Sequence, residues 1–315
     1  KLVTQDGAKA LVLDLRGNGG GFLDQSLAIS NLFLPQGTEL ASVRGRNQEN
    51  QTYTAREKPI APDVPMVILT DQYTASASEI VAGALQDHDR ALILGTTSFG
   101  KGLVQTLFNL DGGYALKITT GKWFTPSGRT IQKERKLLPD GQFVEVHPDS
   151  MESDSARKAR PTYKSDAGRV VYGGGAITPD VIVRPDTFTS AELAFLKATA
   201  PKSQDIYVAT YDYAMELKDQ VKGNPNFAVA PTWRDELYTR LAKKGVTLDR
   251  KLFDGAQAQI DRMLEQRVAR LAFGDSTARR RSLDDDVQLQ KALEILKRGQ
   301  SQKDLFALAP QFSRK

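Results

Sequence analysis

Three short, almost wholly apolar runs alternate with two amphipathic stretches in the first third of the chain. The apolar runs cover residues 9–16, 65–70 and 91–95, and their length and composition are those of strands buried on both faces. Residues 22–34 and 76–86 place apolar side chains at helical spacing and are predicted to form helices. The order strand, helix, strand, helix, strand predicts a layered α/β core with parallel strand pairing.

The pattern becomes one of hairpins and loops beyond the third apolar run. Residues 104–110 and 114–120 flank Asp-Gly-Gly and predict a β-hairpin. Residues 41–55 are polar and predict a hairpin or a loop. Residues 132–172 are charged and rich in turn formers, which predicts an exposed insertion, and residues 173–183 return as a loop and a strand.

The last part of the chain has a helical pattern. Trp233, Leu237 and Leu241 follow one another at spacing four, and similar stripes recur further along. We therefore predict an α/β core over residues 1–185, with a β-hairpin-rich extension, and a helical C-terminal region over residues 186–315.

Composition narrows the classes of function. The 315 residues are 40% hydrophobic, enough for a sizeable core, and contain no cysteine, which excludes disulfides and thiolate sites. The net charge of +5 comes from interspersed charges without a basic stripe among aromatics, so we expect no nucleic-acid partner. No apolar run has the length of about 20 residues that a membrane span needs. The chain begins at Lys1 and reads as a fragment, with any targeting segment expected upstream.

A serine at a helix start is the first candidate for chemistry. Ser76 lies in Thr74-Ala-Ser-Ala-Ser-Glu79, where the helix dipole favours developing negative charge. Ser76-x-x-Glu79 also matches a capping box, and taken alone capping is the favoured interpretation. Ser78 lies about 200° round the helix from Ser76, so only one of these hydroxyls can face a given base.

The base that would activate this serine is not a histidine. His88 lies about 18 Å from Ser76 along the same predicted helix, and His147 falls in the polar insertion. A lysine can replace histidine where burial lowers its pKa. Lys101 lies between two glycines after a buried strand, where we expect a buried amine, although a solvated loop lysine is the commoner case.

Two glycine-rich segments allow further interpretations. Residues 95–102 nearly match a phosphate-binding loop, but Gly102 replaces its Ser or Thr and a β-pattern follows in place of a helix. Residues 17–21 could imitate a dinucleotide fingerprint, but its third glycine would fall at Phe22. Consecutive glycines can also aim backbone amides at an oxyanion, and a flexible turn is about equally consistent with the run.

Together these stretches resemble one family. The chain is similar to the C-terminal processing peptidases, or tail-specific proteases, which are serine proteases with a Ser-Lys dyad. The resemblance covers about residues 9–185, in matching order and spacing. The motifs that carry it are Leu13-Asp-Leu-Arg-Gly-Asn-Gly-Gly-Gly21, Thr74-Ala-Ser-Ala-Ser-Glu-Ile80, Gly100-Lys-Gly-Leu-Val-Gln105, Lys122-Trp-Phe-Thr-Pro-Ser-Gly-Arg-Thr-Ile131 and Ile177-Thr-Pro-Asp-Val181.

The resemblance implies a set of roles. It makes Ser76 the nucleophile, Lys101 the general base and Gln105 the residue that orients the lysine. The oxyanion donors it implies are the amides of Ala77 and of the Gly20–Gly21 turn. Asp87 lies where some members have a supporting acid, but about three helical turns from Ser76 we expect it to be structural.

The resemblance also implies a crotonase-like α/β fold, no cofactor or metal, an upstream PDZ domain absent from this chain, and a periplasmic or cell-envelope location. The expected activity is endopeptidase cleavage of protein or peptide substrates near their C-termini through an acyl-enzyme. Two alternatives stay open: a crotonase-like acyl-transfer enzyme, and an inactive scaffold or dimerising fragment. The C-terminal helices have apolar faces that could form a homo-oligomer.

Overall fold

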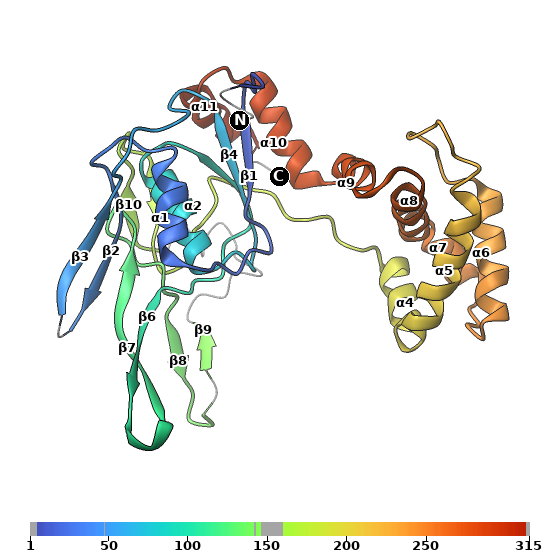
Figure 1. Ribbon diagram of the computed structural model, residues 1–315, viewed down its shortest axis with the longest axis horizontal. Helices are drawn as coiled ribbons and strands as arrows, with labels where there is room; N and C mark the ends of the chain where they lie inside the picture. Colours follow the sequence, from blue (N-terminus) through green and yellow to red (C-terminus); the bar gives the residue numbers. More distant parts are fainter. Residues whose placement is uncertain (1–4, 47, 142, 146–159, 313–315) are drawn as a thin grey trace. The chain divides into compact units, whose positions relative to one another are not determined.

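The chain folds into two compact units, which we describe separately. The computed structural model describes residues 5–46, 48–141, 143–145 and 160–312 (Figure 1). One unit, here called the α/β unit, comprises Lys1–Arg184 and Lys291–Lys315. The other, here called the helical unit, comprises Pro185–Gln290.

A four-stranded parallel sheet is the centre of the α/β unit. Its strands are β1 (Leu11–Asp14), β4 (Met66–Thr70), β5 (Leu92–Gly95) and β12 (Val181–Ile182), in the order β1-β4-β5-β12. All residues of β4 and β5 are buried, as their apolar runs predict. The edge strand β1 is only partly buried, because a neighbouring strand covers just one of its sides.

Two helices lie between these strands in the chain, and the second of them supplies much of the core. They are α1 (Leu23–Asn31) and α2 (Ala77–Asp87), and they pack against each other. Every residue of α2 is buried, so this helix runs through the interior. Its side chain Ile80 joins Ile68 of β4 and Ile93 of β5 in one hydrophobic cluster. The predicted parallel α/β arrangement is confirmed.

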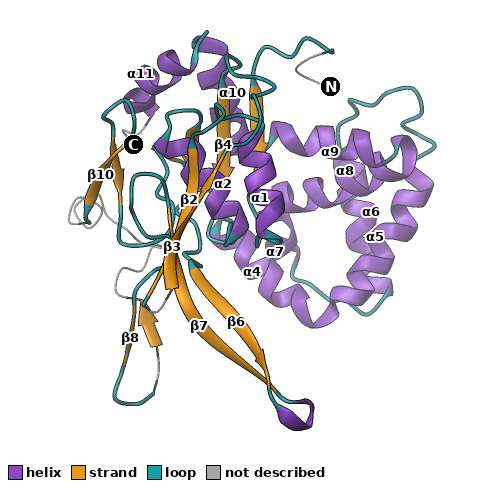
Figure 2. Ribbon diagram, turned by 60° about the vertical axis from the view of Figure 1, so that its left-hand side comes forward, coloured by secondary structure: helices purple, strands orange, loops and turns teal. Residues whose placement is uncertain are grey.

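An antiparallel sheet stands beside this core. Its order is β3-β2-β7-β6, with β2 (Glu39–Gly45), β3 (Gln48–Thr54), β6 (Leu103–Asn109) and β7 (Ala115–Phe124). Figure 2 shows β6 and β7 as a long two-stranded ribbon that ends in the η1 turn (Asp111–Gly113). Both predicted hairpins are therefore present, and β6 is an edge strand.

The predicted insertion contains two short hairpins. They are β8 (Arg135–Leu137) with β9 (Phe143–Glu145), and β10 (Thr162–Lys164) with β11 (Val170–Tyr172). The second hairpin is anchored, not merely exposed: Arg169 forms ion pairs with Asp89 at 2.5 Å and with Asp180 at 2.6 Å. Residues 146–159 of the insertion lie outside the described residues.

The end of the chain belongs to the α/β unit. Its helices are α10 (Val287–Arg298) and α11 (Gln302–Phe312), and α11 packs against β5 and β12. The Met66 amide donates a 2.8 Å hydrogen bond to the Gln302 side chain. The sequence predicts one helical region over 186–315, whereas the structure divides that region after Gln290.

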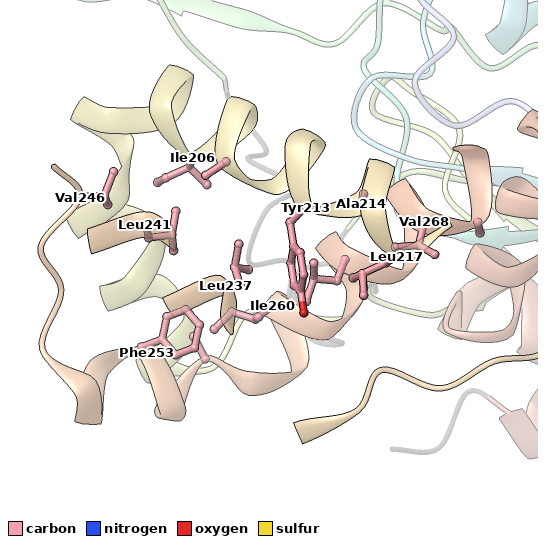
Figure 3. Packing of buried hydrophobic residues seen from close by; sticks show 14 of the residues in the cluster. Ile206, Tyr213, Ala214, Leu217, Leu237, Leu241, Val246, Phe253, Ile260 and Val268 are labelled. Atoms are coloured by element: carbon pink, nitrogen blue, oxygen red, sulfur yellow. The ribbon is translucent and has the colours of Figure 1, made fainter. Parts of the chain in front are cut away.

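The helical unit has its own core. Its helices are α4 (Ser190–Thr199), the 3₁₀ turn η2 (Ala200–Lys202), α5 (Ser203–Leu217), α6 (Pro231–Lys243), α7 (Arg250–Gly255), α8 (Gln257–Phe273) and α9 (Asp275–Asp284). Figure 3 shows Tyr213 and Leu217 of α5 packed among Leu237, Ile260 and Val268. In the described part of the chain, no helix is both long and apolar enough to span a membrane.

Candidate active site

Ser76 lies at the N-cap of α2 in an unusual backbone conformation. Its φ of 58° and ψ of −117° fall in a region that non-glycine residues rarely adopt. Such strain costs about 1–3 kcal/mol and is retained mostly where function needs it. Ser76 is half-buried, whereas Ser78 is only 5% exposed. Of the two hydroxyl residues, Ser76 is therefore the accessible candidate nucleophile.

The carboxylate of Glu79 is the centre of the site. Glu79 is fully buried, and four donors converge on it. Its Oε2 accepts hydrogen bonds from the amides of Ser76 and Lys101, both at 2.8 Å. Its Oε1 accepts from the Ser98 hydroxyl at 2.5 Å and from the Gly100 amide at 2.7 Å. One buried side chain thus joins the start of α2 to the loop that carries Lys101.

This arrangement contains more than the predicted capping box. The predicted capping box between Ser76 and Glu79 is present, and its Ser76 amide donates to Glu79 at 2.8 Å. Burial raises the pKa of Glu79, although its hydrogen bonds act in the opposite direction. Because Ser76 and Lys101 share one oxygen, their amide nitrogens lie within two hydrogen-bond lengths of each other.

The Lys101 side chain differs from the expectation. It is exposed, not buried, because β6 turns outward directly after Gly102. Gln105 is also exposed and follows a register shift between β6 and β7. Among the described residues, no hydrogen bond joins Lys101 to Ser76 or to Gln105. The structure therefore brings together the backbones of Ser76 and Lys101, but not their side chains.

The glycine turn lies directly against Ser76. A Cβ atom on Gly20, whose φ is +91°, would come within 2.6 Å of the Ala75 carbonyl oxygen and 2.8 Å of the Ala77 nitrogen. Only glycine allows this close approach. Asn18 fixes the turn: its carbonyl accepts from the Ala75 amide, and its side chain accepts from the Gly20 amide, both at 3.0 Å.

Two amides at this turn are available for an anion. Within the described part of the chain, neither the Ala77 amide nor the Gly21 amide donates a hydrogen bond. The Gly20 amide is already engaged by Asn18. An oxyanion next to Ser76 could therefore accept from Ala77 and Gly21, with Gly20 supplying the space.

The histidines do not contribute to this site. His88 caps the far end of α2, with Nδ1 2.7 Å from Asp166 and Nε2 2.7 Å from the Glu39 carbonyl oxygen. His147 lies outside the described residues. Asp87 has the structural surroundings that the sequence predicts: it pairs at 2.7 Å with Arg129, and both side chains are 1% exposed.

The cofactor interpretations find no support in the geometry. The loop at 95–102 is followed by strand β6 and not by the helix that a phosphate-binding loop requires. In the 17–21 turn, Gly20 packs closely against the backbone beside Ser76, so the turn belongs to the Ser76 site. No cluster of His, Asp or Glu suited to a metal ion occurs among the described residues.

Sequence reasoning missed two residues of the site, Glu79 as a common acceptor and Asn18 as the anchor of the turn. The spacing Ser76-x-x-Glu79 did predict the contact between Glu79 and the Ser76 amide. The other three donors come from residues 98–101, about twenty positions away, and no local pattern indicates them.

Comparison with known proteins bears on the family that the chain resembles. Residues 1–143 match the family described as peptidase family S41. A carboxy-terminal-processing protease of Bartonella bacilliformis is 48% identical over 131 residues, which are 41% of this chain and 30% of that protein. The first 143 residues of this chain are thus similar to peptidase family S41. The resemblance drawn from the motifs is thereby confirmed.

Two further proteins show similarity over part of the chain. The carboxy-terminal processing protease CtpA of Bacillus subtilis is 41% identical over 41% of this chain and 27% of its own length. Among solved structures, a photosystem II D1 C-terminal processing protease is 37% identical over 41% of this chain and 33% of that chain, with a TM-score of 0.39. The aligned part of this chain spans less than a third of the length of the two curated relatives named here.

Proposed function

We propose that this chain is a serine endopeptidase that hydrolyses peptide bonds through an acyl-enzyme, with Ser76 as nucleophile and Lys101 as general base. Gln105 orients the lysine, and the oxyanion donors are the amides of Ala77 and of the Gly20–Gly21 turn, with Gly21 as the donor of the two. Cleavage near the substrate's C-terminus is proposed from the names of the relatives.

One observation carries this proposal. Glu79 Oε2 accepts from both the Ser76 and the Lys101 amide, so a single buried atom fixes the distance between the two segments. The strained backbone of Ser76 and the two free amides beside it support the same assignment. The crotonase-like fold that we propose is consistent with the mixed α/β architecture of this unit.

The reaction follows from these positions. Lys101 removes the Ser76 proton as the oxygen attacks the scissile carbonyl carbon. The carbonyl oxygen becomes an oxyanion that accepts from Ala77 and Gly21. The lysine then protonates the leaving amine, and the acyl group stays on Ser76. Lys101 then removes a proton from water as the water oxygen attacks the ester carbon. The ester bond to Ser76 breaks, the lysine returns the proton to the Ser76 oxygen, and the new C-terminus is released.

Substrate binding is proposed along β6. This edge strand begins two residues after Lys101 and leaves one side unpaired, so an extended peptide can add to it by backbone hydrogen bonds. Its side chains Leu107 and Phe108 are 62% and 45% exposed, and a bound peptide would bury part of this apolar surface. A bound strand would also bury Lys101 and bring it to Ser76, since catalytic hydrogen bonds often form only in the complex.

The test is labelling of the isolated chain with a fluorophosphonate probe, together with casein cleavage. Wild type should label and cleave. Ser76→Ala should abolish both, and Lys101→Ala should lower both by at least about 100-fold. Ser78→Ala, the matched hydroxyl two residues away, should retain both. Labelling that survives Ser76→Ala, or cleavage unchanged by Lys101→Ala, would refute the assignment.

The glycine turn allows a second test. In Gly20→Ala the new methyl group would meet Ala75 and Ala77 backbone atoms and cover the oxyanion site, so we expect a loss of labelling of at least about 100-fold. Gly19→Ala is the matched control, because a Cβ there meets nothing within 4 Å. If Gly20→Ala and Gly19→Ala were equally active, the glycine turn would have no role in catalysis.

A further inference from the structure

The helical unit contains a cavity of its own. Its volume is about 490 Å³, within the range of pockets that hold small ligands. The walls come from α5, α8 and the segments at 186–188 and 285. All lining residues belong to the helical unit, so the cavity does not involve the peptidase site.

One wall is aromatic. Tyr207 and Tyr211 lie one turn apart on α5, and their rings stack with centroids 6.3 Å apart and planes 9° apart. They are 51% and 40% exposed, whereas Tyr213 and Leu217 of the same helix point into the core shown in Figure 3. The core of the unit therefore does not bury these two rings, which remain partly exposed in the lining of the cavity.

The wall formed by α8 carries a cation, Arg267, without an anionic partner among the described residues. The guanidinium carbon of Arg267 lies 4.0 Å from the centre of the Tyr207 ring. Its Nε is buried and has no hydrogen-bond partner, and no carboxylate among the described residues forms an ion pair with it. The other lining arginines differ: Arg262 pairs with Glu192 at 2.6 Å, and Arg270 pairs with Asp275 at 2.8 Å. Arg267 would gain most from a bound anion.

The surroundings limit the charge of that anion. Asp186 and Asp285 also line the cavity and would repel a dianion such as a phosphate ester. A carboxylate carries a single charge, and its two oxygens match the fork of one guanidinium. The stacked tyrosines beside Arg267 would contact whatever apolar group the carboxylate carries.

We propose that this cavity binds a carboxylate attached to an aromatic or branched aliphatic body. A polypeptide C-terminus and a small aromatic acid share this chemistry. Recognition combines an arginine–carboxylate pair at Arg267 with stacking on Tyr207 and Tyr211. The proposal does not depend on the peptidase reaction.

Calorimetric titration of the full chain carrying Ser76→Ala, so that turnover cannot contribute, tests the proposal. N-acetylphenylalanine should bind at least about tenfold more tightly than N-acetylphenylalanine amide, which lacks the charge. An octapeptide that ends in phenylalanine should show the same preference for a free carboxylate if the source is a chain terminus. If the free carboxylate is preferred over the amide for the small acid but not for the octapeptide, the cavity binds small aromatic acids.

Variants place the binding in the cavity. Arg267→Gln should remove the preference for the carboxylate, and Arg280→Gln, an exposed α9 arginine outside the cavity, should retain it. Gln266→Glu keeps Arg267 but adds a negative charge to the lining, and should weaken the acid by about tenfold even if Arg267→Gln unfolds. Equal binding of acid and amide, no binding of either, an unchanged preference in Gln266→Glu, or tighter binding of phenyl phosphate would overturn the proposal.

Discussion

The two ends of helix α2 bury carboxylates in opposite ways. Asp87 at the C-terminal end pairs with the guanidinium of Arg129, and its charge is compensated. Glu79 at the N-terminal end has no cation among its partners and accepts only from three amides and one hydroxyl. Both side chains are at most 1% exposed. Burial alone therefore does not distinguish the structural carboxylate Asp87 from Glu79 at the candidate site. The two differ in their donors, which include a cation at Asp87 and are all neutral at Glu79.

The difference has a physical consequence. A buried ion pair holds two elements together and fails when either partner is removed. A buried carboxylate without a counter-ion is costly in its charged form, which is why burial raises the pKa of Glu79. Its energy changes with small shifts of Ser76 and Lys101, so this end of α2 is tied to the geometry of the reaction. We expect the C-terminal end to control stability and the N-terminal end to control activity.

The largest effect should come from breaking the ion pair. Arg129→Met leaves Asp87 buried without its cation, so the free energy of unfolding should fall by about 3–5 kcal/mol. Urea denaturation measures this. The molecules that remain folded should label with fluorophosphonate at the wild-type rate. The double variant Asp87→Asn with Arg129→Met removes the stranded charge and should recover part of the loss; a loss below about 1 kcal/mol in the single variant would contradict this view of the pair.

Glu79→Gln should act mainly on activity. Glutamine has one acceptor oxygen, whereas the carboxylate uses two. At least one of the four donors would therefore face the amide N–H of glutamine, and the Ser76 and Lys101 segments would move apart. We expect the labelling rate of Ser76 to fall by about 100-fold, with a loss in stability of about 1–3 kcal/mol.

A matched control for this variant lies in the helical unit. Glu192 occupies the same capping position on α4, where it bonds to the Thr189 amide and pairs with Arg262. Glu192→Gln should cost stability without changing the labelling rate. If Glu79→Gln and Glu192→Gln affected labelling equally, the contrast between the ends of α2 would have no functional meaning.

The smallest effect should be on pH dependence. Because the folded-state pKa of Glu79 is raised, the folded chain holds this proton to higher pH than the unfolded chain does. The stability of wild type relative to Glu79→Gln should therefore decrease as pH rises from the ordinary glutamate pKa through the raised one. Urea titrations of both variants across that range measure it, and a constant difference would show that Glu79 titrates normally.

The same carboxylate should affect labelling in acid. When Glu79 is protonated, its own hydrogen occupies a position that one of the donors now uses, so the Ser76 labelling rate should fall as pH drops through the raised pKa. Glu79→Gln should lack this acid limb. An identical limb in the variant would assign it to another group.

Much of the fold follows from local pattern. The apolar runs of β4 and β5 and the amphipathic stretch of α2 predict a parallel α/β core, because continuous burial of strands requires helices on the faces. Gly-rich turns and β-patterned flanks predict the β6–β7 hairpin. The half-buried β1 and the return of α11 to the parallel sheet were not predictable, since both depend on which elements become neighbours.

By itself, the sequence determined the candidate residues: Ser76 at a helix start, Lys101 between glycines and a glycine turn before both, in an order that resembles one family. Only the tertiary structure decided that Glu79 joins the Ser76 and Lys101 segments and that the Lys101 side chain is exposed. Hydrogen-bond donors from distant segments meet at one carboxylate only after the chain has folded, whereas apolar periodicity is written along the chain itself.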